Sequence, residues 1–232
     1  MGYVFDPAAV LSGQYLDWFL WGIATTIALT AAAWLVGMTT GIILTLVRMV
    51  PFRPCEWLVV GYVEYHRNVP LLVQIFLWYF GIPELLPDVL RDWINSHNSE
   101  FVLATIALGL ANGAYVTEDL RSGIQSIPKT QYEAARSIGF NYMQAMGWVI
   151  LPQAFRIVIP PLVNQTLLLF KNTSLAMAIG VGELTYRTRE VDSYTFKTFE
   201  AFAVATIVYL GISFAIMAIG NIADRKLKLE IR

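Results

Sequence analysis

Few side chains in this sequence could do chemistry, and their spacing excludes the commonest kinds of active site. The 232 residues include a single cysteine, Cys55, and two histidines, His66 and His97. One cysteine cannot form an intramolecular disulfide or a thiolate metal cluster, and the two histidines do not have the spacing of metal ligands. The G-x-x-x-x-G-K-S/T loop of P-loop ATP-binding proteins is also absent. We therefore expect no catalytic residue, no metal ligand and no cofactor in this chain.

The residues that could contact a polar ligand are amide and ionisable side chains within or beside apolar stretches. Such groups are costly to bury against lipid, so in a membrane protein they are functional candidates by default. Each also has a structural interpretation, such as capping a helix end or bonding between helices, and for any single residue that interpretation is the commoner one. The candidates are Arg67, Asn68, Asn112, Glu118, Asn164, Gln165, Lys171 and Asn172.

The composition predicts a membrane protein. Hydrophobic residues make up 56% of the chain and charged residues only 14%, and the mean hydropathy is +0.56. A soluble domain carries about a quarter charged residues, so this chain lacks the side chains that would cover a soluble surface. The net charge of -1 argues against a nucleic-acid partner, which would need a basic face. We expect a single all-α integral membrane domain over 1–232, in contact with lipid.

Long uncharged runs mark the membrane-spanning helices. The longest lies between Asp17 and Arg48 and has 30 residues, more than the roughly 20 that cross the hydrocarbon core of a bilayer. The second span contains Glu64, His66 and Arg67 near its middle. That cluster indicates either a solvated bend near the cytosolic surface or a polar site within the helix. The sequence predicts five spans, at about 18–47, 57–81, 100–121, 149–171 and 200–223.

The distribution of lysine and arginine orients these spans. Arg48 and Arg53 follow the first span and the basic segment 225–232 follows the last, whereas Arg91 is the only arginine or lysine between the second and third spans. Because these residues are enriched on the cytosolic side of membranes, we expect the N-terminus outside and the C-terminus in the cytosol. The loop from Lys171 to Lys197 is the exception, since it carries two arginines on the predicted outer side.

Two glycine pairs have the small-xxx-small spacing that lets helix backbones approach closely. They are Gly37 with Gly41 and Gly109 with Gly113. Glycine is frequent in membrane helices, and its usual role at this spacing is helix packing. We interpret both pairs as packing contacts.

The cytosolic loop at about 124–146 looks like soluble protein between two apolar segments. Pro128 is tolerated in the first turn of a helix, and Lys129–Ile138 favours a helix by propensity. Gly139 fits the left-handed conformation that ends many helices. Asn141 with Gln144 three residues later is the pattern of a second helix start, and Pro152 would interrupt that helix. The loop is therefore predicted to hold two short helices joined by a glycine corner.

The first helix of this loop could be a docking surface. Ala134 and Ala135 would present a flat patch where another protein's backbone comes close, and Glu133 beside them could fix the register by hydrogen bonds. An amphipathic helix lying on the membrane is the alternative, but such helices usually have a basic face opposite bulky apolar residues. This helix has neither, so we favour a protein contact.

The loop also carries a specific motif. Residues 133–152 contain EAA, three residues, G, nine residues, V, one residue and LP. This pattern resembles the EAA loop of ATP-binding-cassette (ABC) importer permeases, with valine in place of the family's usual isoleucine. Three further segments, VEYHRNVPLLVQIFLWYF, AYVTEDLRSGIQSIPKTQ and LFKNTSLAMAIG, starting at residues 63, 114 and 169, resemble the polar amino-acid branch of the type I importers. Residues 67–87 are most similar to glutamate/aspartate permeases of Gram-negative bacteria.

The resemblance implies a type I ABC importer permease fold and a multi-pass protein of the bacterial inner membrane. In that family the loop docks in a cleft of a cytosolic ATPase, which holds ATP and Mg²⁺. Glu133, Ala134, Ala135 and Gly139 would thus couple this chain to an ATPase dimer. The resemblance also implies a second homologous permease, forming a heterodimer with this one, and a periplasmic amino-acid-binding protein. The chain itself would be a non-catalytic subunit of an ATP-hydrolysing translocase.

Glutamate or aspartate is the cargo that the resemblance implies, with glutamine, arginine or histidine as alternatives. A dicarboxylate would need cationic side chains or helix N-termini along its path, and Arg67 and Lys171 are the candidates. Two other classes of protein stay open from the sequence. A self-contained secondary transporter would normally show internal repeats, which are not visible here. A membrane assembly protein without a transport role would not copurify with an ATPase.

Overall fold

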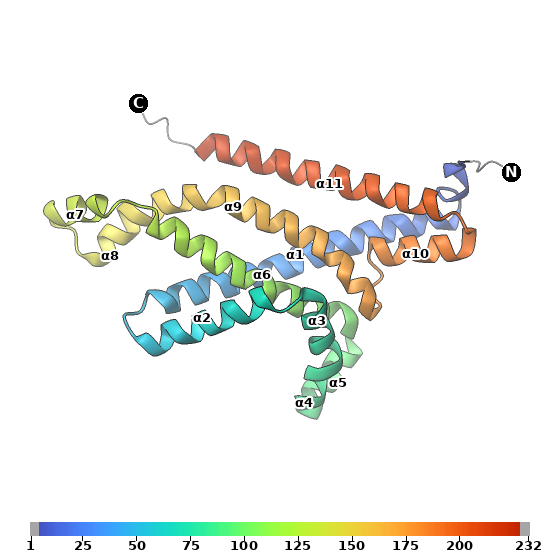
Figure 1. The fold of residues 1–232 in the computed structure, drawn as a ribbon, viewed down its shortest axis with the longest axis horizontal. Helices are drawn as coiled ribbons and strands as arrows, with labels where there is room; N and C mark the ends of the chain where they lie inside the picture. Colours follow the sequence, from blue (N-terminus) through green and yellow to red (C-terminus); the bar gives the residue numbers. More distant parts are fainter. Residues whose placement is uncertain (1–4, 228–232) are drawn as a thin grey trace.

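The computed structural model describes residues 5–227, and within that range the chain forms helices and no β-strand. Residues 228–232, part of the basic C-terminal segment, lie outside the described residues. The all-α prediction is confirmed. The long helices run along the long axis of the molecule (Figure 1); they are α1 (Gln14–Met49), α2 (Arg53–Asn68), α6 (Ser99–Gln125), α9 (Leu151–Asn172) and α11 (Thr198–Leu227).

The shorter elements lie at the two ends of this bundle or project from its side (Figure 1). At one end are η1 (Pro7–Ala9) and α10 (Leu184–Thr195), with η4 (Thr173–Ile179) linking α9 toward α10. At the other end are α7 (Lys129–Ser137), α8 (Tyr142–Ala145) and the π-helical turn η3 (Met146–Ile150). The projecting arm consists of α3 (Leu71–Phe76), the π-helical turn η2 (Leu77–Gly81), α4 (Ile82–Leu85) and α5 (Asp88–Ser96).

Helix α6 is the centre of the bundle. It packs against α1, α2 and α9, and 61% of its apolar stretch is buried, whereas only 6% of that of α11 is buried. The glycine pairs lie in the contact between α1 and α6. A Cβ added to Gly37 would lie 2.5 Å from the Asn112 Nδ2 atom, and one added to Gly109 would lie 2.6 Å from the Val36 side chain. Larger residues would force the two helices apart, so the packing interpretation is confirmed.

The second predicted span, 57–81, is not one helix. The chain breaks between Asn68 and Leu71, and the helical segments on either side are bent by 108°. Pro70 explains the break, because proline has no N–H to donate and disfavours helical backbone in the residue before it. Val69 accordingly has φ -94° and ψ 130°, which is extended backbone.

This break comes before α2 is long enough to cross a membrane. Helix α2 begins at Arg53, close to the end of α1 at Met49. Its 16 residues rise by about 24 Å, less than the roughly 30 Å of a hydrocarbon core. Of the two interpretations of the Glu64–Arg67 cluster, the structure favours a polar break inside the span.

The fourth span begins earlier than predicted. Tyr142–Ile179 is helical without interruption, so the second short helix of the loop continues into the membrane. The expectation that Pro152 would interrupt this helix is wrong. The π-helical turn Met146–Ile150 immediately precedes α9, and the Leu151 N–H bonds to the Met146 oxygen five residues back. The wider turn accommodates the proline, which lies in the first turn of α9.

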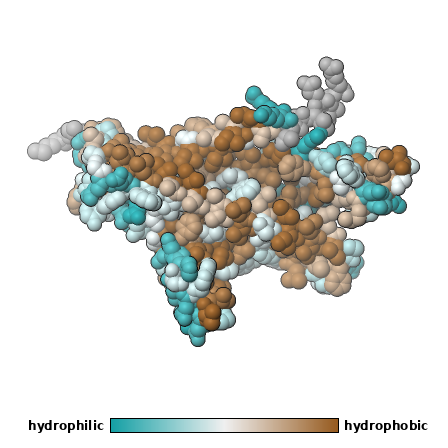
Figure 2. All heavy atoms as spheres, turned by 180° about the vertical axis from the view of Figure 1, so that it is seen from behind, coloured by the Kyte–Doolittle hydropathy of each residue, from teal (hydrophilic) through white to brown (hydrophobic). Residues whose placement is uncertain are grey.

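The described residues contain four single helices long and apolar enough to cross a membrane, and the broken pair of α2 with α3–α4 makes a fifth if it crosses as one unit. Figure 2 shows the surface that follows: hydrophobic residues cover the middle of the molecule, and hydrophilic residues gather at both ends and on the arm. This distribution is that of a protein whose bundle is surrounded by lipid.

Candidate functional site

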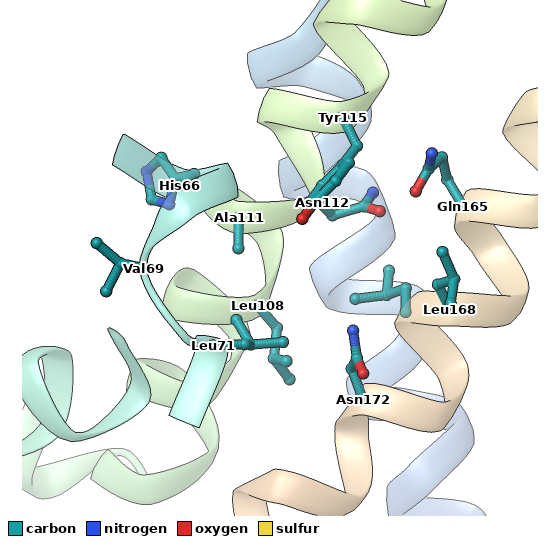
Figure 3. Close-up of a pocket in the computed structure, with 11 residues that line it drawn as sticks. His66, Val69, Leu71, Leu108, Ala111, Asn112, Tyr115, Gln165, Leu168 and Asn172 are labelled. Atoms are coloured by element: carbon teal, nitrogen blue, oxygen red, sulfur yellow. The ribbon is translucent and has the colours of Figure 1, made fainter. Parts of the chain in front are cut away.

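A cavity of about 210 Å³ lies where the break between α2 and α3 faces α6 and α9 (Figure 3). Its walls follow from helix geometry, since the α6 residues and the α9 residues each repeat at intervals of three and four, the spacing of one helix face. The break supplies the third wall. The lining residues are His66, Val69, Leu71, Leu108, Ala111, Asn112, Tyr115, Gln165, Leu168, Leu169 and Asn172.

The Gln74 side chain stabilises the bent backbone between α2 and α3. It is 1% exposed, and its Nε2 amide donates to the His66 and Val69 backbone oxygens at 3.0 and 2.8 Å. Its Oε1 atom lies 2.6 Å from His66 Nδ1. The amide thus pairs carbonyls that the break leaves without helical partners, and it fixes the imidazole that lines the cavity.

Three amide side chains face the cavity. Figure 3 shows Asn112 on α6 across from Gln165 on α9, with Asn172 further along α9. Asn112 is 6% exposed, and its Nδ2 atom is buried without a hydrogen-bond partner among the described residues. A buried amide donor that lacks a partner loses about 1–3 kcal/mol of hydration free energy, and this Nδ2 atom lies against α1, where a Cβ added to Gly37 would be 2.5 Å away.

A cation and an anion lie beside the amides. The Arg67 guanidinium carbon is 5.7 Å from the centroid of the Tyr115 ring. Asp119, one helical turn after Tyr115, lies beside the Gln165 side chain and interacts electrostatically with Arg67. The Asp119 Oδ2 atom is buried and has no hydrogen-bond partner within the described chain. Arg67 and Asp119 therefore lie beside lining residues of the cavity, although neither side chain lines it.

Of the eight residues predicted to contact a polar ligand, the structure brings four to this site. Asn112, Gln165 and Asn172 line the cavity, and Arg67 lies beside it. Asn68 instead closes the end of α2, because its Nδ2 atom donates to the oxygens of Glu64 at 2.8 Å.

The other three candidates point elsewhere. Glu118 forms an ion pair with Arg48, which ties α1 to α6, and a second one with Arg121 on its own helix. Asn164 lines a separate hollow of about 160 Å³ between α9 and α11. Lys171 is exposed and does not line the cavity.

Sequence reasoning missed Tyr115, which lines the cavity, and Asp119, which lies beside Gln165. Both could have been found, because they follow Asn112 by three and seven residues and so share its helix face. His66 was noted only as a member of the polar cluster in the second span, and the break after Asn68 is what completes the cavity wall at this residue.

The loop at the opposite end has the local structure that its sequence predicts. Helix α7 begins at Lys129, and Gly139 has a φ of 93°, the left-handed conformation expected of a helix stop. Asn141 and Gln144 form a reciprocal capping box, with both bonds at 2.9 Å. The two helices and the glycine corner are confirmed.

The surface of this loop differs from the expected alanine patch. Glu133 and Ala134 are exposed, but Ala135 is only 3% exposed and packs within this chain. Ala135 is therefore not available to a partner. Large apolar side chains are exposed beyond the corner instead, namely Ile138 at 73% and Met143 at 75%.

Comparison with known proteins decides the family. Residues 37–229 match the family model of binding-protein-dependent transport system inner membrane components. The chain belongs to this family. The match includes the EAA motif, the broken span and every residue that lines the cavity, and the resemblance to ABC importer permeases is confirmed.

Curated relatives of the permease are amino-acid permeases. The chain is 36% identical to the glutamate/aspartate import permease protein GltJ of Escherichia coli (strain K12), over 93% of this chain and 89% of that protein. It is 35% identical to the probable glutamine ABC transporter permease protein GlnM of Bacillus subtilis (strain 168), over 93% of this chain and 94% of that one.

A solved structure shows the fold of the permease. It is a crystal structure of an amino acid ABC transporter with histidines, which matches at a TM-score of 0.85 and 28% identity. The match covers 97% of this chain and 100% of that chain. The permease therefore has the type I ABC permease fold that the motif implied.

Proposed function

We propose that this chain is a permease subunit of an ATP-driven amino-acid importer and that its cavity binds the amino acid during transport. The three amide side chains that line the cavity, Asn112, Gln165 and Asn172, are the observation that carries the proposal, because polar groups inside a membrane bundle are costly and are functional candidates by default. At about 30 Å³ per water, the cavity has the volume of about seven waters, which suits one small polar molecule.

The groups around the cavity fit both charges of an amino acid. An α-carboxylate can accept bonds from the amides that line the cavity and from Arg67 beside it, since guanidinium groups recognise carboxylates well. An α-ammonium can donate to the oxygens of the same amide side chains.

Glutamate or aspartate is the cargo that we propose. The similarity to GltJ supports it, and Arg67 is the cation beside the cavity. Glutamine is the second candidate, because GlnM is nearly as similar and three amides line the site.

We propose partners on both sides of the membrane and within it. The exposed surface of the loop, with Glu133, Ala134 and the apolar residues Ile138 and Met143, would dock on a cytosolic ATPase dimer that holds ATP and Mg²⁺. A second homologous permease would complete the path through the bacterial inner membrane, and a periplasmic binding protein would deliver the amino acid. GltK of Escherichia coli, 30% identical to this chain, is a second glutamate/aspartate permease of the same organism as GltJ.

Motion of the ATPase can reach the cavity through one helical segment. Tyr142–Ile179 runs from the loop, through η3, into α9, which carries Gln165 and Asn172. Closure of the ATPase dimer would displace α7 and α8 and shift this cavity wall against α6. The amino acid would lose its bonding partners and leave, while no bond within it is made or broken by this chain.

Uptake by the complex reconstituted in liposomes tests the proposal. We expect ATP-dependent import of labelled glutamate and aspartate, stimulated by the binding protein. Arg67→Gln should reduce this import at least tenfold, whereas Lys171→Gln, which removes a cation outside the cavity, should not. Preference for arginine, histidine or glutamine would overturn the acidic cargo and leave the importer standing. Failure to import any amino acid would overturn both.

A further inference from the structure

Helix α5 (Asp88–Ser96) exposes an apolar stripe to its surroundings. Val89 is 80% exposed and Trp93, one turn later, is 53% exposed, while Leu90 beside them is 50% exposed. At 100° per residue these three side chains occupy one side of the helix, next to the buried Ile94. Exposed apolar side chains aligned in this way mark a contact surface.

The opposite side of α5 is polar and nearly neutral. Asp88 and Arg91 form an ion pair one turn apart, and Asp92 and Asn95 lie on the same side. With one arginine against two aspartates, this face offers no basic patch to anionic headgroups. Attachment of α5 to another surface must therefore depend on its apolar side.

Short connections confine α5 to a membrane surface. Two residues, Leu86 and Pro87, join it to α4, and two more, His97 and Asn98, join it to α6. Linkers of this length reach about 10 Å. Both neighbours belong to segments that enter the membrane, so neither end of α5 can move far from the level at which they emerge. Figure 1 shows α5 on the projecting arm, away from α9 and α11.

We propose that α5 lies along the membrane surface with Val89, Leu90 and Trp93 inserted among the lipids at the boundary of headgroups and acyl chains. Tryptophan is enriched at this boundary, because its ring is apolar and its indole N–H can remain hydrated. The ring of Trp93 is held by stacking on His97, with centroids 4.6 Å apart and planes inclined by 21°. Helix α5 thereby anchors the arm that begins at the break lining the cavity.

Collision of spin labels with oxygen and with a nickel chelate tests this placement. The labels would be attached to single cysteines in a Cys55→Ser background, with the complex in zwitterionic lipid nanodiscs. Labels at Val89 and Trp93 should collide often with oxygen and rarely with nickel, while the matched label at Asn95 on the same helix should show the reverse. Frequent nickel collisions at Val89 would mean exposure to water and would overturn the proposal. Infrequent collisions with both reagents would mean burial against a protein, and would overturn it equally.

A second measurement needs no added cysteine. Phosphatidylcholine brominated near the top of its acyl chains quenches tryptophan fluorescence by contact. Trp93→Phe in the intact complex should remove part of the quenchable signal, and an unchanged quenched fraction would contradict the proposal. Neither measurement depends on which amino acid is transported, so their outcome is separate from that of the uptake assay.

Discussion

Replacing Gln74 by leucine should destabilise the permease and disable its cavity together. Leucine has a similar size, so the packing of this buried position changes little, but three polar contacts are lost. These are the two bonds to the His66 and Val69 oxygens and the contact with His66 Nδ1. The two oxygens lie at the break, where the chain offers them no helical donor.

The loss of unfolding free energy can be estimated from these contacts. A buried hydrogen bond contributes about 1 kcal/mol net to a protein, and bonds between membrane helices average about 0.6 kcal/mol. The substitution Gln74→Leu should therefore cost about 2 to 3 kcal/mol of unfolding free energy. It should also free the His66 ring to leave the cavity wall.

Gln153 provides a matched control. Gln153 belongs to α9, and its Nε2 atom makes a single hydrogen bond among the described residues, to the Val149 oxygen at 2.7 Å. Thermal unfolding of the purified complex in detergent should show a shift for Gln74→Leu two to three times that for Gln153→Leu, and only Gln74→Leu should lose amino-acid uptake. Equal shifts, with uptake intact in both variants, would refute the claim that Gln74 holds the break.

Three further predictions concern other parts of the fold. Gly139→Val should weaken copurification of the ATPase and lower uptake while insertion continues, because a β-branched residue resists a φ of 93°; Gly61→Val, at an open position without positive φ, should do neither. Gly109→Leu should reduce the yield of folded permease, since even a Cβ there would lie 2.6 Å from the facing helix, whereas Gly211→Leu, with nothing within 4 Å, should not. Glu183 lies outside the spans, and burial raises the pKa of its carboxyl above the ordinary 4.5. The protonated carboxyl therefore stabilises the folded state fully below about pH 4.5, and this stabilisation is lost as the pH rises through the raised pKa. Glu183→Gln should flatten that part of the pH dependence of thermal unfolding, and an unchanged profile would exclude this origin.

The loop was predictable because its signals are local. A positive φ at Gly139 and a capping box at Asn141 depend on residues within one helical turn, so the sequence contains the whole cause. The burial of Ala135 depends on how α7 packs against η3. Propensity and spacing within α7 carry no information on that contact.

Pro70 and Pro152 show that the effect of a proline on a helix cannot be predicted from neighbouring residues alone. Pro70 breaks a span that hydropathy marks as continuous, and the Gln74 amide satisfies the backbone oxygens of His66 and Val69 that this break exposes. Pro152 leaves its helix continuous, because a π-helical turn precedes it. The same residue type thus ends one helix and not the other, and the difference lies in partners that only the folded chain supplies.

The polar residues predicted for the site also divide into some that local sequence locates and others that depend on the folded chain. Polarity in an apolar segment marked Asn112, Gln165 and Asn172, which line the cavity, but it marked Glu118 equally, and that side chain forms ion pairs with two arginines instead. Which polar groups face a cavity depends on the rotation of each helix about its axis. Counting in steps of three and four from Asn112 leads to Tyr115 and Asp119. Helix periodicity could therefore have predicted these two residues from the sequence.

Binding of labelled glutamate to the purified permease complex, without the binding protein, tests the cavity most directly. Asn112→Leu removes an unpaired buried amide, so it should leave thermal stability unchanged or higher. It should nevertheless weaken glutamate binding at least tenfold, while Asn164→Leu, in the separate hollow between α9 and α11, binds as the unmodified complex does. Unchanged glutamate affinity in a stable Asn112→Leu complex would contradict the account, because the amino acid would then bind elsewhere.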